Sequence, residues 1–291
     1  MGASLNSRPR LDYINSMLSG ADLRFLVDTL MPGTADKAKM VRALREDEEI
    51  LEGVLKDGRL VERILEDPEA ILRISPRLFF LALLNRVRQD LEHRSYTLEQ
   101  EHRYQTVIFD AGEVAGLLGE KPIRDYLAEM LASFARVNSF SVTVRMRRGM
   151  WRRLRFNDFD LDSLIRFSQL LQEQQRFQLY RRSADLCLFT LGVFPERLSS
   201  PASPPGSGSP RPGKQASRGR EGCAEQGRFF YRAAARQKEA QLARLDGVLE
   251  QLAEHFLLAS KPLSFLADHY LKPFKRDLFP GEPAPGAPPA P

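Results

Sequence analysis

Proline is concentrated in two short segments of this chain, and this distribution constrains the fold more than any other feature. Eleven of the nineteen prolines fall within residues 196–226 and 280–291. An interior proline removes a backbone hydrogen bond from a helix and clashes with the preceding turn, so the proline-poor remainder is free to form helices. The sequence therefore predicts a mainly α fold, a multi-helix body that is interrupted once and followed by a tail.

The interrupting segment, residues 196–226, also holds five glycines, six serines and almost nothing apolar. A segment of this composition buries too little surface to offset the conformational entropy that it would lose on ordering. The tail, 280–291, has six prolines in twelve residues. We therefore predict a disordered linker at 196–226 and a disordered C-terminal tail at 280–291.

Apolar residues recur at helical spacing through most of the remaining chain. Asp47, Asp57 and Asp67 fall ten residues apart, and each precedes an apolar set. Aspartate is a favoured N-cap, so this spacing predicts three short packed helices. A longer helix is predicted from Pro76 to about Arg94. The predicted helical parts are an N-terminal region at 1–103, a helical pair at 159–195 and C-terminal helices at 227–279.

A single long helix is predicted over residues 229–259. Apolar residues there alternate three and four apart, which is heptad spacing, at Leu242, Leu245, Leu249, Leu252 and Phe256. Two interpretations follow from this stripe. The helix packs on the N-terminal body, or it forms a homodimer through residues 231–259.

Residues 140–156 alternate between apolar and polar positions on both sides of Arg148-Gly149, which predicts a β-hairpin. A two-residue loop would set Val142 opposite Arg155, whereas a loop of odd length sets Val142 opposite Phe156. Because a shift of one residue moves every side chain to the other face, the apolar pattern favours the odd loop. In that register Arg145 faces Arg153 directly, on a face shared with Arg147, Arg155, Thr143 and Trp151.

The hairpin also holds the excess positive charge of the chain. Residues 141–156 contain six arginines and no acidic residue, while the whole chain carries a net charge of +5, so the rest carries −1. A concentrated basic feature is an electrostatic footprint for nucleic acid, or less often for an acidic protein surface. The candidate nucleic-acid-binding residues are Arg145, Arg147, Arg148, Arg152, Arg153, Arg155 and Trp151, with Arg124 from the preceding helix.

The predicted elements around the hairpin follow the order of a winged helix-turn-helix. They are a first helix at 76–94, a strand at 104–109, helices at 111–118 and 121–138, and the hairpin at 140–156. This resemblance of topology defines a winged-helix-like segment at 104–158. The face of the helix at 121–138 that we expect to be exposed is roughly neutral, so the hairpin would dominate binding. That face holds Arg124, Asp125, Glu129, Ser133 and Arg136.

Motifs of catalysis and metal binding are not found in the sequence. Glu99 and His102 form a single Glu-x-x-His, and Cys187 and Cys223 lack metal spacing. There is no His-Glu-x-x-His, no phosphate-binding glycine loop and no Gly-x-Ser-x-Gly elbow. We therefore predict no cofactor, no metal and no enzymatic activity.

The longest apolar run, Leu78–Leu84, is far shorter than the roughly 20 residues of a membrane helix. No secretory signal is visible either, so we expect a cytoplasmic protein without membrane contact. The leading functional prediction is a DNA-binding or DNA-associated protein that contacts phosphates through the hairpin. The alternative is a non-enzymatic helical adaptor that binds proteins through the winged-helix-like segment and the C-terminal helix.

Overall fold

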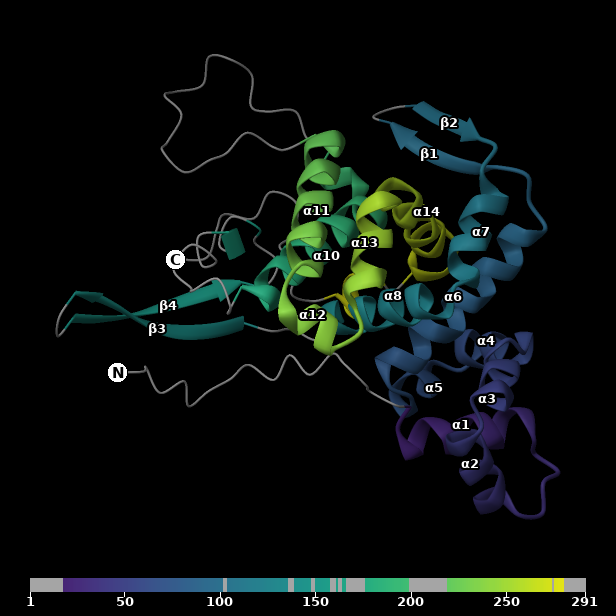
Figure 1. Ribbon diagram of the computed structural model, residues 1–291. Coiled ribbons are helices and arrows are strands. Elements are labelled where there is room, and N and C mark those ends of the chain that lie inside the picture. The colour runs from purple at the N-terminus through teal and green to yellow at the C-terminus, as the bar shows by residue number, and fades with distance from the viewer. Residues whose placement is uncertain are drawn as a thin grey trace.

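The fold is mainly helical, as the sequence predicts, and it carries two antiparallel sheets of two strands each. Figure 1 shows a helical body with one group of short helices at its lower edge. The computed structural model describes residues 18–101, 104–135, 139–147, 150–157, 161, 164–165, 176–198, 219–273 and 275–279. Most of the predicted linker, residues 199–218, and the predicted tail at 280–291 lie outside these ranges.

Short capped helices form the N-terminal part of the chain. Asp47, Asp57 and Asp67 each accept hydrogen bonds from backbone N–H groups in the first turn of the following helix, which confirms the predicted caps. Asp47 and Asp67 are also the C-caps of the helices before them, so these helices stay short. They are α1 (Gly20–Leu30), α2 (Lys37–Glu46), α3 (Glu48–Leu55), α4 (Gly58–Glu66) and α5 (Pro68–Arg73).

Asp22 joins this N-terminal group to the central helices. Its carboxylate is buried, and it accepts hydrogen bonds from the backbone N–H of Ser19 at 2.9 Å and of Ser75 at 2.7 Å. Ser75 in turn caps α6 (Pro76–Glu92). One carboxylate therefore satisfies backbone donors at the starts of α1 and α6, which fixes the two helices relative to each other.

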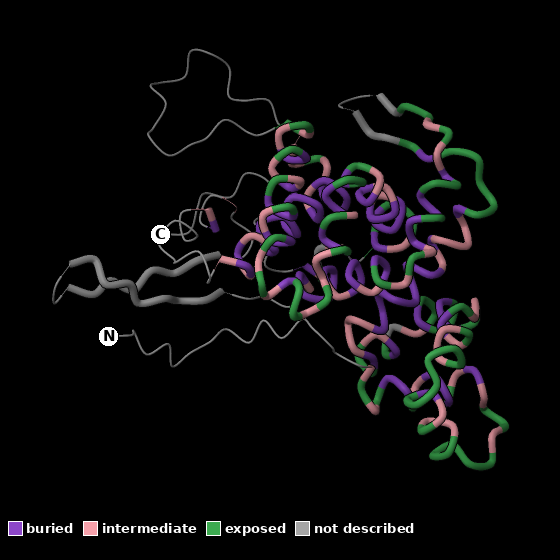
Figure 2. The backbone as a smooth tube through the Cα atoms, viewed as in Figure 1, coloured by how far each residue is buried: buried purple, intermediate pink, exposed green. Residues whose placement is uncertain are grey.

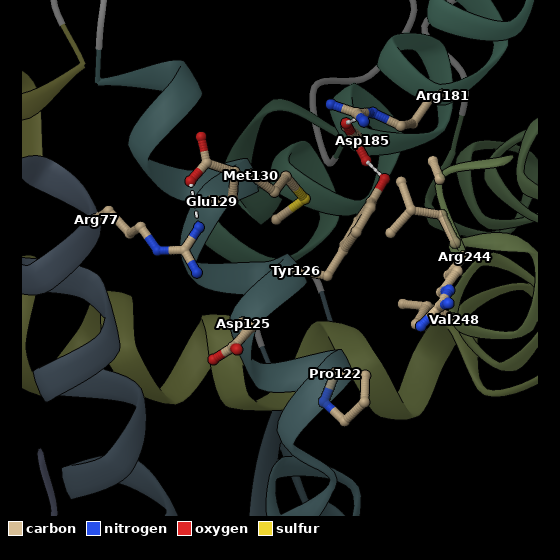
Figure 3. Close-up of a pocket in the computed structure, with 12 residues that line it drawn as sticks. Arg77, Pro122, Asp125, Tyr126, Glu129, Met130, Arg181, Asp185, Arg244 and Val248 are labelled. Atoms are coloured by element: carbon tan, nitrogen blue, oxygen red, sulfur yellow. Dashed lines mark hydrogen bonds and ion pairs between the residues drawn. The ribbon is translucent and has the colours of Figure 1, made fainter. Parts of the chain in front are cut away.

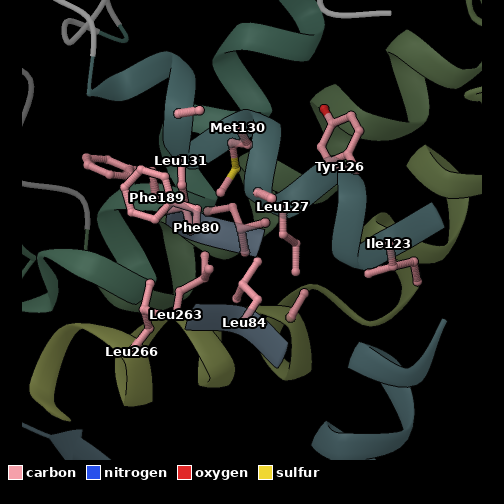
Figure 4. Packing of buried hydrophobic residues seen from close by; sticks show 14 of the residues in the cluster. Phe80, Leu84, Ile123, Tyr126, Leu127, Met130, Leu131, Phe189, Leu263 and Leu266 are labelled. Atoms are coloured by element: carbon pink, nitrogen blue, oxygen red, sulfur yellow. The ribbon is translucent and has the colours of Figure 1, made fainter. Parts of the chain in front are cut away.

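The hydrophobic core lies around α6, and Figure 2 shows its buried stretches running through the middle of the body. In Figure 4, side chains from four helices meet there: Phe80 and Leu84 of α6, Leu127 and Leu131 of α8, Phe189 of α10, and Leu263 and Leu266 of α14. The stacked rings of Phe134 and Phe189 are 4.2 Å apart. The helices around this core are α7 (Ala111–Gly119), α8 (Lys121–Phe134), α10 (Phe177–Val193) and α14 (Phe256–Leu266).

Phe279 anchors the end of the described chain in the same core. Its ring packs 4.9 Å from that of Phe189 and 6.0 Å from that of Phe80. The remaining short elements are η2 (Pro195–Arg197), the π-helical turn η3 (Ala267–Leu271) and α15 (Lys275–Leu278).

The C-terminal helical region differs from its prediction in two ways. Helix α11 (Arg220–Ala235) begins inside the segment assigned to the linker, so residues 220–226 are helical. The continuous helix over 229–259 is wrong, because the chain is divided there into α11, α12 (Lys238–Leu242), α13 (Asp246–Glu254) and α14. Arg244, with a φ of 55°, adopts a left-handed conformation that ends one helix before the next begins.

The heptad stripe belongs to the intramolecular core. Leu249, Leu252 and Phe256 are fully buried, whereas Leu242 is 76% exposed. Periodicity marks which residues are buried but not what buries them. Of the two interpretations of this stripe, packing on the body agrees with the structure, and the homodimer through 231–259 has no continuous exposed seam in the described chain.

The two sheets lie on different sides of the body in Figure 1. Strand β2 (Tyr104–Ile108) pairs with β1 (Thr97–Glu101), a strand that the sequence analysis missed. Strands β3 (Ser139–Arg147) and β4 (Met150–Asn157) form the predicted arginine hairpin. In a winged helix the strand after the first helix pairs with the wing. In the described chain β2 lies in a separate sheet, so the chain has the element order of a winged helix but not this strand pairing.

Gly227 allows α11 to approach α14 closely, and this contact is testable. A Cβ atom built there would lie 2.1 Å from Cζ of the buried Phe256 ring. We expect Gly227→Ala to lower the free energy of unfolding by about 1–3 kcal/mol. As the matched control, Gly116→Ala on the open side of α7, where nothing lies within 4 Å, should raise it by about 0.5–1 kcal/mol. Urea unfolding measures both, and equal changes would contradict this packing.

Candidate functional site

The arginine hairpin is a two-stranded arm that extends from the helical body in Figure 1. Five of its six arginines lie on the paired strands, at positions 145, 147, 152, 153 and 155, together with Trp151. Arg148 lies in the connection between the strands, outside the described residues. The chain therefore places the predicted cluster on one element that projects from the body.

The register of the arm corrects one part of the prediction. Arg147 pairs with Met150, as a two-residue loop requires, but an extra residue on β3 shifts the pairing between Arg145 and Arg147. Beyond this bulge Val142 lies opposite Leu154 and Phe140 opposite Phe156. Apolar residues therefore lie opposite one another as expected, but the predicted partner of Val142, Phe156, is wrong, because a bulge rather than a loop of odd length sets the register.

Because of this shift, Arg145 is not opposite Arg153 as predicted. Arg145 faces Trp151, Arg153 faces Thr143, and each of the other strand arginines also faces an uncharged residue. Like charges directly opposite each other destabilise a sheet. The observed register avoids that arrangement at every described pair, so the hairpin accommodates its high charge density without a directly opposed arginine pair.

Arg124 does not belong to this interface. It is only 1% exposed, and its guanidinium donates hydrogen bonds to the Leu118 carbonyl at 3.1 Å and to Glu52 at 2.5 Å. Its prediction as a nucleic-acid contact is therefore wrong. The periodicity of α8 could not show that Glu52, from α3 and 72 residues away in sequence, covers this position.

The other described residues of this predicted face also have partners, and Arg136 lies outside the described residues. Ser133 is buried and accepts a hydrogen bond from Arg182 of α10 at 2.7 Å. Glu129 pairs with Arg77 at 3.0 Å, and Asp125 pairs with Lys121 at 2.6 Å. Helix α8 is thus a core helix, and the described structure leaves it no free face for reading bases.

A second polar site, missed by the sequence analysis, is a pocket of about 210 Å³ beside α8 (Figure 3). Its walls come from α6, α8, α10, α13 and the turn between α12 and α13. The charged lining residues are Arg77, Asp125, Glu129, Arg181, Asp185 and Arg244, and the other lining residues are Pro122, Tyr126, Met130, Ala243, Leu245 and Val248.

The innermost part of this pocket is a buried hydrogen-bonded cluster around Asp185. The hydroxyls of Tyr126 and Tyr231 donate to Oδ1 of Asp185 at 2.6 and 2.8 Å, and Arg181 Nε lies 3.8 Å from Oδ2. Burial raises the pKa of Asp185 above its ordinary value, against the opposing charge of Arg181. Burial, reinforced by the Asp185 charge, raises the pKa of both tyrosines well above 10, so they remain hydroxyl donors.

The signal for this cluster is present in the sequence. Arg181, Arg182 and Asp185 lie within an otherwise apolar helix, and the four-residue spacing of Arg181 and Asp185 places them on one face. Charged residues inside an apolar stretch are buried only when they are paired. Their tyrosine partners come from α8 and α11, and no spacing rule predicts them.

Comparison of the chain with family models, with curated proteins and with solved structures finds no match. The described residues contain no group of three or more histidine, cysteine, aspartate or glutamate side chains that could hold a metal ion. None of the described helices is long and apolar enough to cross a membrane.

Asp185 makes the stability of the fold depend on pH. Because its pKa is raised in the folded chain, its stabilising contribution is complete below the ordinary value of 3.8 and is lost as pH rises through the folded-state pKa. Asp185→Asn removes this titration. We therefore expect the stability advantage of the wild type over Asp185→Asn to shrink as pH rises above 3.8. Urea unfolding at several pH values measures it, and an advantage that grows with pH would mean that Arg181 lowers this pKa instead.

Proposed function

We propose that this protein binds nucleic acid through the β3–β4 arm, with duplex DNA as the preferred class. The observation that carries the proposal is the concentration of charge: six arginines and no acidic residue between positions 141 and 156, on an arm that extends from a body whose remaining sequence carries −1. Such a concentrated cationic element attracts the phosphate backbone and steers association.

The dimensions of the arm suit a duplex. Strand β3 has nine residues and β4 has eight, and a strand rises about 3.3 Å per residue, so the arm is roughly 25–30 Å long. The major groove admits a two-stranded ribbon. Arginine also forms bidentate contacts with phosphate.

The proposed binding depends weakly on base sequence. Phosphate contacts fix position and orientation but carry no base information, and the buried α8 offers no exposed set of reading side chains. In the proposed binding mode, the predicted wing acts as an arm that contacts phosphates, and no recognition helix is needed.

Replacing Arg145, Arg147, Arg153 and Arg155 with serine tests this proposal. We expect duplex affinity to fall by at least about tenfold at low salt, and the slope of log affinity against log salt to flatten by roughly 3.5, because about four phosphate contacts are lost. Fluorescence anisotropy with a random duplex at several salt concentrations measures both, and circular dichroism should show an intact fold.

The matched control removes four exposed cations from the opposite part of the fold, with Arg24, Lys39, Arg42 and Arg45 changed to glutamine. Both variants lose the same net charge. If the arm is the interface, the control should change the affinity and its salt slope much less. Equal losses in the two variants would show that net charge alone drives binding, and unchanged affinity of the arm variant would contradict the proposal.

Protein assembly is the second candidate function, and exposed apolar side chains on and beside the β1–β2 hairpin favour it. Tyr96, Leu98, Val107 and Phe109 are all exposed, and Phe109 is 80% exposed. Leu98 and Val107 lie directly opposite each other in the sheet. In the described chain each of these strands has only one neighbour, and an apolar hairpin with unpaired edges is a template for strand pairing. A second copy of this chain is the occupant that this geometry fits.

Sedimentation of the wild type and of Leu98→Lys/Val107→Glu separates the two candidates. If β1–β2 joins two copies, the wild type should be dimeric at micromolar concentration, and the double variant should be a folded monomer. A Leu242→Glu control changes a comparably exposed leucine outside the hairpin and should leave the dimer intact. A monomeric wild type would contradict assembly through this hairpin and leave the arm proposal unaffected.

A further inference from the structure

The charges that line the pocket beside α8 are paired except for one. Glu129 pairs with Arg77, Asp125 with Lys121, and Asp185 lies beside Arg181 and accepts from two tyrosines. Each lining carboxylate therefore lies beside a cation, although Lys121 also pairs with Glu48 at 2.9 Å. Arg244, the third lining arginine, is exposed, and no side-chain hydrogen bond or ion pair joins its guanidinium to the described residues, so it is the lining cation that remains available to a ligand.

Arg244 is also held in an unusual backbone conformation. Its φ of 55° lies in the left-handed region, which glycine adopts without cost and a residue with a Cβ atom adopts rarely. Backbone N–H groups fix this turn, with Arg244 donating to Gln241 at 3.0 Å and Leu245 donating to Ala240 at 2.9 Å. The fold thus keeps a strained arginine at the pocket, and residues in this conformation gather at ligand-binding sites.

The rest of the lining is largely apolar. Pro122, Met130, Leu245 and Val248 contribute aliphatic surface, and the Tyr126 ring adds an aromatic face while its hydroxyl is committed to Asp185. Figure 3 shows Arg244 and Val248 on one wall, across from Glu129 and Met130. A ligand that fits this lining needs an apolar body and one anionic group.

The size of the pocket limits that ligand. An apolar cavity of about 150 Å³ in another protein holds benzene. A pocket of about 210 Å³ therefore has room for a benzene-sized body with one carboxylate, and it is smaller than the pockets of drug-sized molecules.

We propose that the pocket between α6, α8, α10 and the α12–α13 turn binds a small organic monoanion of the aryl or short-chain carboxylate class. Arg244 contacts the carboxylate, and the apolar body lies against Tyr126, Met130 and Val248. The paired charges deeper in the pocket are already satisfied within the chain, so they select against a dianion or a cation. This site is separate from the arm and does not depend on nucleic-acid binding.

Benzoate and its uncharged isostere benzamide test the proposal on the full-length chain. Ligand-observed NMR titration should show that the wild type binds benzoate about tenfold more tightly than benzamide. Arg244→Gln should remove that preference while benzamide binding stays the same, and Arg244→Lys, which keeps the charge, should retain a preference for benzoate. Arg236→Gln changes an exposed arginine that does not line the pocket, so it should bind both ligands as the wild type does.

A further variant distinguishes loss of the anion contact from loss of the fold. Arg244→Gly relieves the left-handed strain, so its thermal midpoint should rise by a few degrees while the preference for benzoate disappears. The proposal is overturned if benzoate fails to bind the wild type at about 10 mM, if benzamide binds equally well, or if Arg244→Gln retains the preference. Each of these results leaves the nucleic-acid proposal standing, because the arm lies outside this pocket.

Discussion

The burial of α8 within the core is the constraint on which the rest of the structure depends. This helix packs against α6 and α7, and its polar side chains are taken up by Glu52 of α3, Arg77 of α6 and Arg182 of α10. A helix held in this way serves as a scaffold, and one described part of it that stays open lines the pocket. The groups that can contact a partner therefore lie at three places in the fold: the arginine arm, the β1–β2 hairpin and the pocket at the N-terminal end of α13.

The pairing of charges also differs between the interior of the fold and these three places. Inside the fold, the charged groups on α8 have partners of opposite charge. The Asp185 cluster shows how a buried carboxylate is tolerated when two hydroxyls and a guanidinium surround it. In the arm and at the mouth of the pocket, some positive charges have no opposite charge described beside them. The Arg244 guanidinium has no described partner, and the arm holds six arginines without a single acidic residue. Unmatched charge that the fold does not need for its own stability is the physical basis of both functional proposals.

Local signals predicted much of this structure, and long-range contacts explain what they missed. The aspartate caps and the start of α6 at Pro76 are set by neighbours within a few residues, and both are observed. In the arginine hairpin apolar residues do lie opposite one another, but the register differs by two residues from the predicted one. The burial of Arg124 depends on Glu52, which is far away in the sequence, and the break at Arg244 lies in a left-handed turn that apolar periodicity does not mark. Periodicity alone therefore gave an exposed recognition face and a continuous helix instead. The bulge in β3 could not be predicted either. A loop of odd length, and a loop of even length with one extra residue in a strand, both place the apolar residues on one face, so the apolar pattern does not distinguish them.

Hydrogen exchange of backbone amides with and without a duplex tests the central claim most directly, because it locates the contact along the chain rather than inferring it from affinity. We expect slower amide exchange in residues 139–157 when DNA binds, and unchanged exchange in α8 and in helices α1–α5. Protection confined to α2 or to the pocket around Arg244, or no protection anywhere at saturating duplex, would contradict the assignment of the arm as the nucleic-acid interface.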